Sequence, residues 1–399
     1  MRNGWTYHQF KLFRILLGGF LIVHFTHLIP FAMEVFSNQG ALADASNSPL
    51  IYLFPNILTW FDSPTFLTIL LGLGVLAGFG IILGKHDKLS AFYSFYLLAC
   101  LLSRNPLITN PSLPYLGWML ILYLFIPAKK ENETWHLPGS LYFAAWAVLA
   151  LTYTYSGYTK LLSPSWVSGE TIEFVLQNPL ARGTWFREWL LSLPPIYLKS
   201  LTWGILWVEA LFVPLALVKR LRPFVWLVML IVQFGFLICL NFADLTFPML
   251  LIHLITFDPN WIKAKEYKSL LWLFYDGECG FCHRYVRLVL SEDKKECIHF
   301  APLQGEFFKR NALHASPNID SMYVHMPDGT LHSRTEAVII IFRALGGLYA
   351  IYGIILAFIP KAIRNAAYDL NAKLRLYYFK KPDDLCPIIP IHYRDRFEM

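Results

Sequence analysis

Two cysteines separated by two residues, Cys279 and Cys282, are the groups in this 399-residue sequence best suited to chemistry. They follow a short apolar run that ends at Asp276-Gly277, and they open a helix-like stretch at residues 284–290. Free amide N–H groups and the positive end of the helix dipole stabilise a thiolate at the start of a helix. The second cysteine lies one turn later, close enough to form a disulfide. This pattern predicts thiol–disulfide exchange, with Cys279 as the exposed nucleophile and Cys282 as the partly buried resolving thiol.

Two other interpretations of the cysteine pair stay open. A structural zinc ion could be bound by the pair together with His283, Cys297 and His299, although the last two would lie along a strand rather than in a turn. Cys-X-X-Cys-His, which ends here at His283, is also the attachment signature of c-type haem and would need an exported domain. We favour dithiol chemistry, which requires no metal or other cofactor.

The neighbouring acid and the other cysteines have more than one interpretation. Asp276 could tune the thiolate or take a proton from the resolving thiol, or it could be a turn residue that precedes glycine. Cys386 could be a third redox thiol or a buried core residue, and we favour the core residue. Cys100 and Cys239 lie inside apolar segments and are predicted to be packing residues.

The chain is too apolar for a single soluble domain of its length. Hydrophobic residues make up 56% of it, charged residues make up 15%, and its mean hydropathy is +0.45. Up to about Phe257 the apolar residues come in nearly uncharged blocks of roughly 15–25 residues, the length that a bilayer core demands. After Pro259 the sequence becomes mixed and charged. We therefore predict a membrane domain at residues 1–262 and a soluble domain at residues 263–399.

The apolar blocks predict a bundle of about eight transmembrane helices. They cover residues 10–34, 65–84, 89–103, 113–127, 139–161, 197–218, 223–241 and 244–257. Alternate loops are basic, with Lys85 and Lys88 in one and residues 219–222 in another. Basic loops stay in the cytoplasm, so the N-terminus and the soluble domain are predicted to be cytoplasmic in a multi-pass protein of the inner (plasma) membrane. The net charge of +7 clusters beside the apolar blocks, which indicates membrane orientation rather than nucleic-acid binding.

The soluble domain alternates strand-like and helix-like segments. Strands are predicted at residues 270–275, 297–302, 321–326 and 330–332, and helices at residues 282–290 and 335–345, with more helix towards residue 379. The turn Pro327-Asp-Gly329 joins the last two strands as a hairpin. This order predicts a small α/β sheet of the thioredoxin-like kind. The apolar residues 348–359 are too few to span a bilayer and could form a core helix or lie against the membrane.

The segment Tyr275-Asp-Gly-Glu-Cys-Gly-Phe-Cys282 resembles the Asp-X-X-Cys-X-X-Cys signature of the DCC-type thiol–disulfide oxidoreductases. Further similar segments are Phe300-Ala-Pro-Leu-Gln304, Arg334-Thr-Glu-Ala337 and Ile359-Pro-Lys-Ala-Ile-Arg-Asn-Ala-Ala-Tyr368. The resemblance covers nearly all of residues 271–386. It implies a thioredoxin-like fold in which Cys279 and Cys282 are the redox pair and Asp276 is a signature residue.

The resemblance leaves the substrate open, because the substrates of this family are poorly defined. We expect a protein or a small molecule that carries a thiol or a disulfide. A thioredoxin also has a cis-proline that faces its disulfide. No proline directly precedes the strand at residues 321–326, and Pro302 and Pro317 are imperfect candidates for that position.

A second candidate site lies in the membrane domain, at Lys160 and Glu209. Ionisable groups at depth in a membrane are costly and often functional, and Glu209 lies near the middle of its predicted helix. Lys160 ends a span and could instead extend to the interface, which is the interpretation that we favour. His24, His27 and His253 are predicted to be hydrogen-bonded packing residues rather than metal ligands.

Residues 5–262 also resemble the transmembrane domain that vitamin K-dependent γ-carboxylases share with the horizontally transferred transmembrane proteins. Residues 13–18, 155–169 and 241–261 carry the resemblance. In the carboxylases, the lysine that matches Lys160 is the base in vitamin K oxidation, so the resemblance implies a quinone or lipid-like ligand near Lys160. The loop at residues 109–114 lacks the carboxylase histidine, which counts against the carboxylase reaction. The alternative function is therefore a membrane site that binds a quinone or lipid, with the thiol domain as its reductant.

Overall fold

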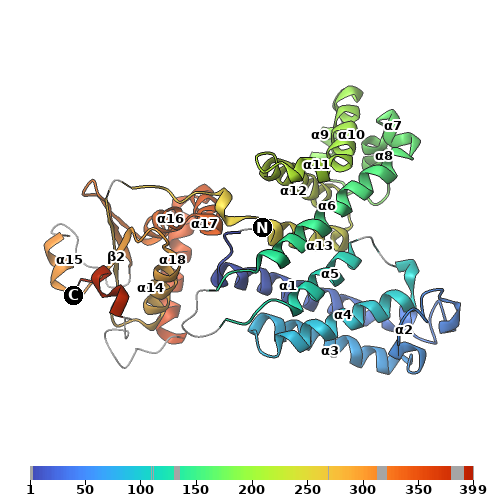
Figure 1. Cartoon of the computed structure of the whole chain (residues 1–399), viewed down its shortest axis with the longest axis horizontal. Coiled ribbons are helices and arrows are strands. Elements are labelled where there is room, and N and C mark those ends of the chain that lie inside the picture. Colours follow the sequence, from blue (N-terminus) through green and yellow to red (C-terminus); the bar gives the residue numbers. More distant parts are fainter. Residues whose placement is uncertain are drawn as a thin grey trace. The chain divides into compact units, whose positions relative to one another are not determined.

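The computed structural model describes residues 3–108, 110, 112–129, 135–267, 269–311, 321–378 and 391–398. Two compact units make up the chain, Met1–Phe257 and Asp258–Met399. Figure 1 follows both units along the sequence, from the blue N-terminal helices to the red C-terminal ones.

The described part of the N-terminal unit is helical (Figure 1). Its α-helices are α1 (Tyr7–Leu28), α2 (Ala32–Phe36), α3 (Pro64–Leu83), α4 (Asp87–Arg104), α5 (Leu113–Leu124), α6 (Gly139–Leu161), α7 (Pro164–Ser168), α8 (Thr171–Gln177), α9 (Trp185–Leu191), α10 (Pro195–Ala210), α11 (Phe212–Leu217), α12 (Arg222–Cys239) and α13 (Ala243–Thr256). Short 3-10 helices occur at Ile29–Phe31, Ala45–Asn47, Ile57–Thr59 and Pro106–Ile108. Each predicted span contains a helix, and α10 and α11 share one of these spans.

Helix α13 joins two groups of helices in this unit. In the first group α1 packs against α3, α3 against α4, and α4 against α5, while in the second α6 packs against α10 and α11. Helix α13 contacts α1, α5, α6 and α12. Helices α6 and α10 pack closely at Gly157 of α6. A Cβ at this position would lie 2.2 Å from the backbone nitrogen of Ala210.

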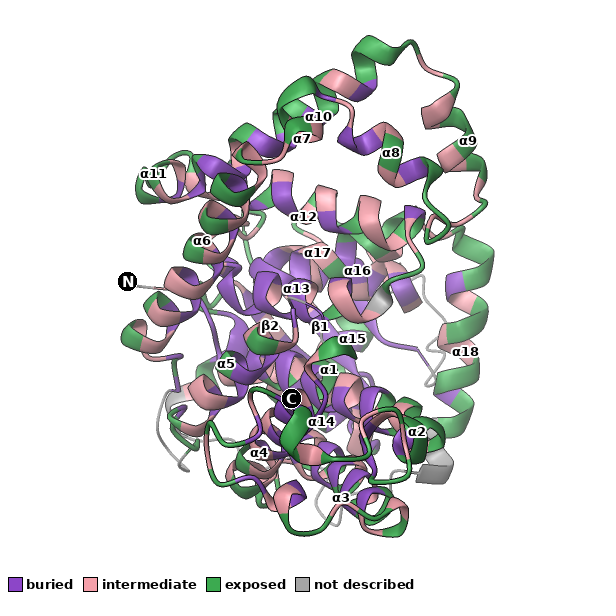
Figure 2. Cartoon of the chain, turned by 90° about the vertical axis from the view of Figure 1, so that its right-hand side faces the viewer, coloured by how far each residue is buried: buried purple, intermediate pink, exposed green. Residues whose placement is uncertain are grey.

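Among the described residues, three helical segments are long and apolar enough to cross a bilayer, namely Tyr7–Phe36, Pro64–Leu83 and Arg222–Cys239. Two shorter helices, Leu113–Leu124 and Asp244–Thr256, are also apolar. The long segments expose apolar side chains such as Val23, Leu76 and Ile231. Figure 2 colours these helices by the burial of their residues. A bilayer would solvate such side chains, whereas water would not. Crossing by the remaining predicted spans stays a prediction.

Buried polar contacts fix the helices of this unit relative to one another. The Tyr153 hydroxyl on α6 lies 2.8 Å from Nε2 of His253 on α13 and accepts a hydrogen bond from Nε2 of Gln233 on α12 at 3.0 Å. Elsewhere, Nδ1 of His24 lies 3.8 Å from Oδ1 of Asp244. These histidines connect helices, which is consistent with a packing role.

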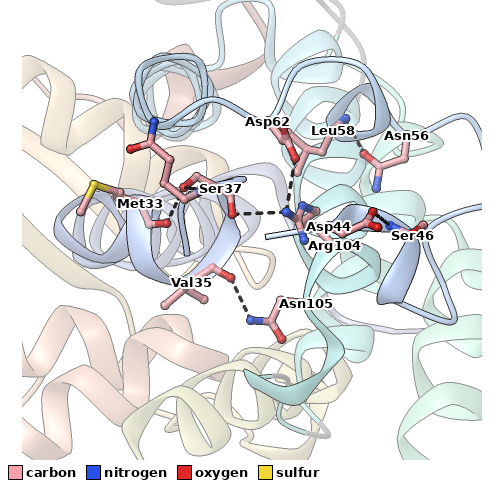
Figure 3. Close-up of polar contacts among 11 residues, drawn as sticks. Met33, Val35, Ser37, Asp44, Ser46, Asn56, Leu58, Asp62, Arg104 and Asn105 are labelled. Carbon is pink, nitrogen blue, oxygen red and sulfur yellow. Dashed lines mark hydrogen bonds and ion pairs between the residues drawn. The ribbon is translucent and has the colours of Figure 1, made fainter. Parts of the chain in front are cut away.

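A buried arginine ties the loop after α2 to the end of α4 (Figure 3). Arg104 is fully buried, and its Nη2 donates to the carbonyl oxygen of Ser37 and to Oδ2 of Asp62, each at 3.3 Å. Asn105 adds a bond from its side-chain amide to the carbonyl oxygen of Val35 at 2.8 Å. A buried guanidinium is strongly destabilising without its acceptors, so these contacts hold the loop in place. The sequence analysis gave Arg104 no role, because its acceptors lie 67 and 42 residues earlier in the chain.

The C-terminal unit contains a small mixed sheet. Its strands are β1 (Leu271–Tyr275), β2 (Ile298–Pro302), β3 (Tyr323–His325) and β4 (Leu331–Ser333), in the order β2-β1-β3-β4. Strand β1 runs parallel to β2 and antiparallel to β3, and β4 runs antiparallel to β3. The helices are α14 (Gly280–Glu292), α15 (Glu306–Asn311), α16 (Arg334–Leu345), α17 (Gly347–Phe358) and α18 (Lys361–Tyr378), with 3-10 helices at Pro259–Trp261 and Ile391–Arg396. The strands lie close to their predicted positions.

Strand β1 is buried on both faces and organises the core. Leu273 belongs to a cluster with Val286 of α14 and Ile341 of α16, whereas Phe274 belongs to a second cluster with Phe308 of α15. A central strand that is covered on both sides explains the continuous apolar run in its sequence. The end of this strand is the starting point of the candidate site.

Candidate functional site

Strand β1 and helix α14 place the two cysteines. The strand ends at Tyr275, a turn follows, and Cys279 is the N-cap residue of α14. The Cys279 N–H donates to the carbonyl oxygen of Asp276 at 3.3 Å, and the Cys279 carbonyl accepts from the N–H of His283 at 3.1 Å. Cys282 lies in the first turn. The first cysteine is therefore at the positive end of a helix of 13 residues.

Both cysteines are buried, so the prediction of an exposed Cys279 is wrong. Cys279 is 4% exposed and Cys282 is 7% exposed, and both belong to the core cluster that contains Leu273. The reason is the amphipathic character of α14. Cys282, Val286 and Val289 are spaced along one face of the helix, and this face packs against the sheet.

An apolar cavity of about 290 Å³ lies beside Cys282. Aromatic side chains of three helices line it, including Phe281 of α14, Phe342 of α16 and Tyr368 of α18. Asn371 and Ala372 extend the wall that α18 contributes. The cavity therefore offers room for an apolar group next to a cysteine that is itself buried.

Polar contacts hold α18 in place over this cavity. They are the Arg364–Glu336 ion pair, the Thr335–Asn365 hydrogen bond, the Arg334–Asp369 ion pair (Nε to Oδ1, 3.1 Å) and the Tyr368 hydroxyl, which accepts from the N–H of Met322 at 3.0 Å. Two of these contacts, Arg364–Glu336 and Thr335–Asn365, join the segments at residues 334–337 and 359–368. The sequence analysis used both segments for the family resemblance but assigned none of their residues a role.

The proline candidates lie elsewhere. Met322, not a proline, is the residue directly before β3. Pro302 is the last residue of β2, and Pro317 falls outside the described residues. All peptide bonds in the part of the chain that the structure describes are trans. Cys386, the predicted core or third redox thiol, also falls outside the described residues.

Asp276 organises the turn that precedes the cysteines. Its Oδ1 accepts hydrogen bonds from the N–H of Glu278 at 3.0 Å and from Nε2 of Gln304 at 2.9 Å. Oε1 of Gln304 accepts in turn from the N–H of Gly277 at 3.1 Å. Asp276 and Gln304 thus fix the turn from two sides. This role of Gln304 was not predicted from the sequence, and its place in a family-like segment was the available signal.

We expect Asp276→Asn to retain the rate of dithiol oxidation within about threefold, because an amide oxygen can accept the same two hydrogen bonds. A residue that takes a proton in the reaction would lose about 10²-fold or more on this change. Stopped-flow oxidation of the reduced protein at pH 7 measures the difference. Asp276→Ala is the control, and its loss of both acceptor bonds should lower the free energy of unfolding by about 1–3 kcal/mol. A hundredfold slower Asp276→Asn protein would contradict the turn role.

His283 and Cys297 do not complete a metal site with the cysteine pair. Nε2 of His283 lies 2.7 Å from the carbonyl oxygen of Gly277. Because a carbonyl only accepts, this nitrogen carries its hydrogen and is not available as a ligand. The Sγ of Cys297 donates to Oδ1 of Asp293 at 3.5 Å. Within the described ranges, no group of three or more His, Cys, Asp or Glu residues could hold a metal ion, which counts against the zinc alternative.

Cys297 should react slowly with alkylating agents at neutral pH. Burial, followed by the nearby carboxylate of Asp293, raises the pKa of Cys297 to about 11. Because only the thiolate reacts, we expect its alkylation by N-ethylmaleimide to accelerate about tenfold per pH unit from pH 8 to pH 10 and to level off above pH 11. Peptide mass spectrometry at fixed reaction times measures this profile. A rate that is already constant at pH 8 would contradict the assignment.

The structure brings together Lys160 and Glu209, the two candidates in the N-terminal unit. Lys160 lies at the end of α6 and Glu209 near the end of α10, and Nζ of Lys160 donates to Oε2 of Glu209. The side chains are 19% and 4% exposed, respectively. Nζ also lies 4.7 Å from the centroid of the Trp166 ring, within cation–π range. Lys160 is therefore directed to a buried carboxylate rather than only to the interface.

Comparison with known proteins identifies the C-terminal unit. Residues 273–381 match the DCC1-like thiol-disulfide oxidoreductase family. Uncharacterized protein YuxK of Bacillus subtilis (strain 168) is 30% identical over 116 residues, which cover 28% of this chain and 82% of YuxK. The chain belongs to the DCC1-like thiol-disulfide oxidoreductase family. This confirms the DCC-type resemblance.

The DCC1-like match includes Asp276, both cysteines of the pair and the α16 and α18 segments that contact each other. Residues 1–272 lie outside it, and the resemblance of that part to the γ-carboxylases stays a prediction. No solved structure matches the chain.

Proposed function

We propose that the C-terminal unit catalyses thiol–disulfide exchange, with Cys279 and Cys282 as its dithiol. The observation that carries this proposal is the position of Cys279 at the N-cap of α14, one turn before Cys282, within a segment that matches an oxidoreductase family. The strand order β2-β1-β3-β4, with β3 antiparallel to β1, supports a thioredoxin-like fold.

The reaction has two steps, and the electrons balance within the dithiol. The Cys279 thiolate attacks one sulfur of a substrate disulfide, forms a mixed disulfide and expels the first substrate thiolate. The Cys282 thiol then loses its proton and attacks Sγ of Cys279, which expels the second substrate thiolate. The protein dithiol is oxidised to a disulfide and the substrate disulfide is reduced to two thiols. The proton of Cys282 goes to one leaving thiolate, and the other takes from water the proton that Cys279 had released.

The residues around the pair have separate tasks in this proposal. The first-turn amides of α14 stabilise the Cys279 thiolate. Asp276 and Gln304 hold the turn that precedes it. The cavity beside Cys282 accepts an apolar group of the substrate. Because α18 forms one wall of this cavity, a substrate larger than the cavity has to displace α18.

For the N-terminal unit we propose an inner-membrane domain that leaves the redox unit in the cytoplasm, supported by the basic alternate loops. A quinone at Lys160 is less well supported. The amine of Lys160 contacts the Glu209 carboxylate, so it would have to leave this partner before it could act on a ligand. We therefore propose that the Lys160–Glu209 pair is structural.

Differential alkylation of the full chain tests the redox proposal. The protein is reduced, freed of reductant and treated with a small aromatic disulfide, and its cysteines are mapped by mass spectrometry. We expect one disulfide between Cys279 and Cys282, two released thiols per protein, and a Cys297 that takes part in no disulfide. Two remaining thiols at positions 279 and 282, or a disulfide from Cys279 to a different cysteine, would contradict the proposal.

A further inference from the structure

Helices α17 and α18 form an elbow on the C-terminal unit. They meet at Ile359 and Pro360, with a bend of 117° between them. Pro360 has no N–H with which to continue the hydrogen bonds of α17, and Ile359 is extended, with a ψ of 132°. The sequence itself therefore requires the bend.

The outer side of this elbow is apolar and exposed. Six large side chains form it, and we call them the elbow surface: Ile354, Ile355, Phe358, Ile363, Leu370 and Leu374, with exposed fractions from 42% to 86%. Figure 2 shows most of α18 among the exposed residues. On α18, residues 363, 370 and 374 are seven and four positions apart, so they share one face. Large apolar side chains that are exposed together on one segment mark a contact surface.

Helix α18 cannot rotate to bury the elbow surface, because polar contacts hold its opposite face. Arg364, Asn365 and Tyr368 make hydrogen bonds to α16 and to the residue before β3, and Ala372 is buried. These residues alternate along the helix with those of the elbow surface. Rotation of α18 about its axis would break the polar contacts, so the apolar face stays outward.

We propose that the elbow surface binds the surface of a lipid bilayer and seats the C-terminal unit on it. The same chain contains three helical segments that are long and apolar enough to cross a bilayer, so a bilayer lies within reach. The bend prevents α17 and α18 from crossing as one straight helix. An elbow can instead lie among the lipid headgroups, with its apolar side chains in contact with the acyl chains.

The charges on α18 fit an anionic bilayer. Lys361 and Lys373 are exposed, and Asp369, the one acidic residue in the α18 sequence, is ion-paired with Arg334. Of the two lysines, Lys373 flanks the stripe of residues 363, 370 and 374, and lysines at such a stripe are typical of interfacial helices and attract anionic headgroups. The same charges give no comparable reason for a second copy of the chain to bind there, because each copy would present the same basic face.

Photo-crosslinking of the full chain in nanodiscs tests this surface. The nanodiscs contain phosphatidylglycerol, phosphatidylcholine and a phospholipid with a diazirine in its acyl chain. Peptide mass spectrometry should find lipid adducts at residues 354–374, and adducts on α1, α3 and α12 serve as the internal reference. Phe358→Glu combined with Ile363→Glu should lower the elbow adducts by about tenfold or more, because apolar contacts are replaced by charge. The reference adducts should not change.

The matched control is Ser291→Glu, which adds a charge at an exposed position of α14 and should leave the elbow adducts unchanged. Omission of phosphatidylglycerol should lower the elbow adducts by at least about fivefold, and Lys361→Gln combined with Lys373→Gln should remove this dependence.

Elbow adducts no more frequent than those on α14 would overturn the proposal. Cross-links between two elbow surfaces, or from the elbow surface to the N-terminal unit, would also overturn it, because protein rather than lipid would then cover the surface. None of these measurements depends on disulfide exchange, so this proposal and the redox proposal can fail separately.

Discussion

Cys279→Ser is expected to abolish disulfide reduction by the full chain, with a rate at least about 10³-fold lower. A serine hydroxyl is not ionised at neutral pH and cannot replace a thiolate nucleophile. The N-cap position of Cys279 is the physical basis of this prediction, since the first-turn amides of α14 stabilise the sulfur anion that attacks. The measurement is the rate of reduction of a small aromatic disulfide under single-turnover conditions.

Cys282→Ser separates the two roles within the pair. The first step should still occur, so one equivalent of substrate thiol should be released and the other half of the substrate should remain bonded to Cys279. Intact-protein mass spectrometry detects this mixed disulfide. Cys297→Ser is the matched control and should leave the rate unchanged. The pKa of Cys297 is raised, and Cys297 precedes the start of β2, whereas the cysteine pair follows the end of β1 that lies beside the last residue of β2. A Cys279→Ser protein with normal activity, or a mixed disulfide on Cys282, would reject the assignment.

Lys160→Met is expected to lower the free energy of unfolding of the N-terminal unit by about 3–5 kcal/mol. Glu209 is 4% exposed and receives the hydrogen bond from Lys160, so the substitution leaves a buried carboxylate without its ion-pair partner. Removal of one member of a buried ion pair is costly for this reason. Unfolding in mixed micelles at pH 7 measures the loss, and Lys219→Met, at an exposed position, is the matched control.

A double substitution decides whether the pair is structural. Glu209→Gln combined with Lys160→Met removes both charges, and we expect it to recover most of the lost stability, because neither charge remains buried alone. The carboxylase-like alternative would be supported by a different pair of results. Lys160→Met would leave the stability unchanged, and the purified protein would lose its binding of a naphthoquinone. The two outcomes are mutually exclusive, so the experiment discriminates between structure and function at Lys160.

Local patterns in the sequence were sufficient to predict the oxidoreductase family and much of the C-terminal fold. The spacing of Cys279 and Cys282 after an apolar run predicted a strand, a turn and a helix that begins at the cysteines, and β1 and α14 have this arrangement. The hairpin of β3 and β4 followed from the turn at Pro327-Asp-Gly329. These features depend on periodicity, turn residues and helix ends, which act over a few neighbouring residues.

Contacts between residues that are distant in the sequence could not be predicted from local patterns. The burial of Cys279 depends on which face of α14 meets the sheet, the Lys160–Glu209 pair joins positions 49 residues apart, and the bond from Gln304 to Asp276 spans 28 residues. The wall that α18 forms over the cavity depends on α16, to which it is held by ion pairs. Each of these features results from packing among several helices and strands at once. Periodicity specifies that a helix has an inner face, but the surface that the inner face meets is set by the whole chain.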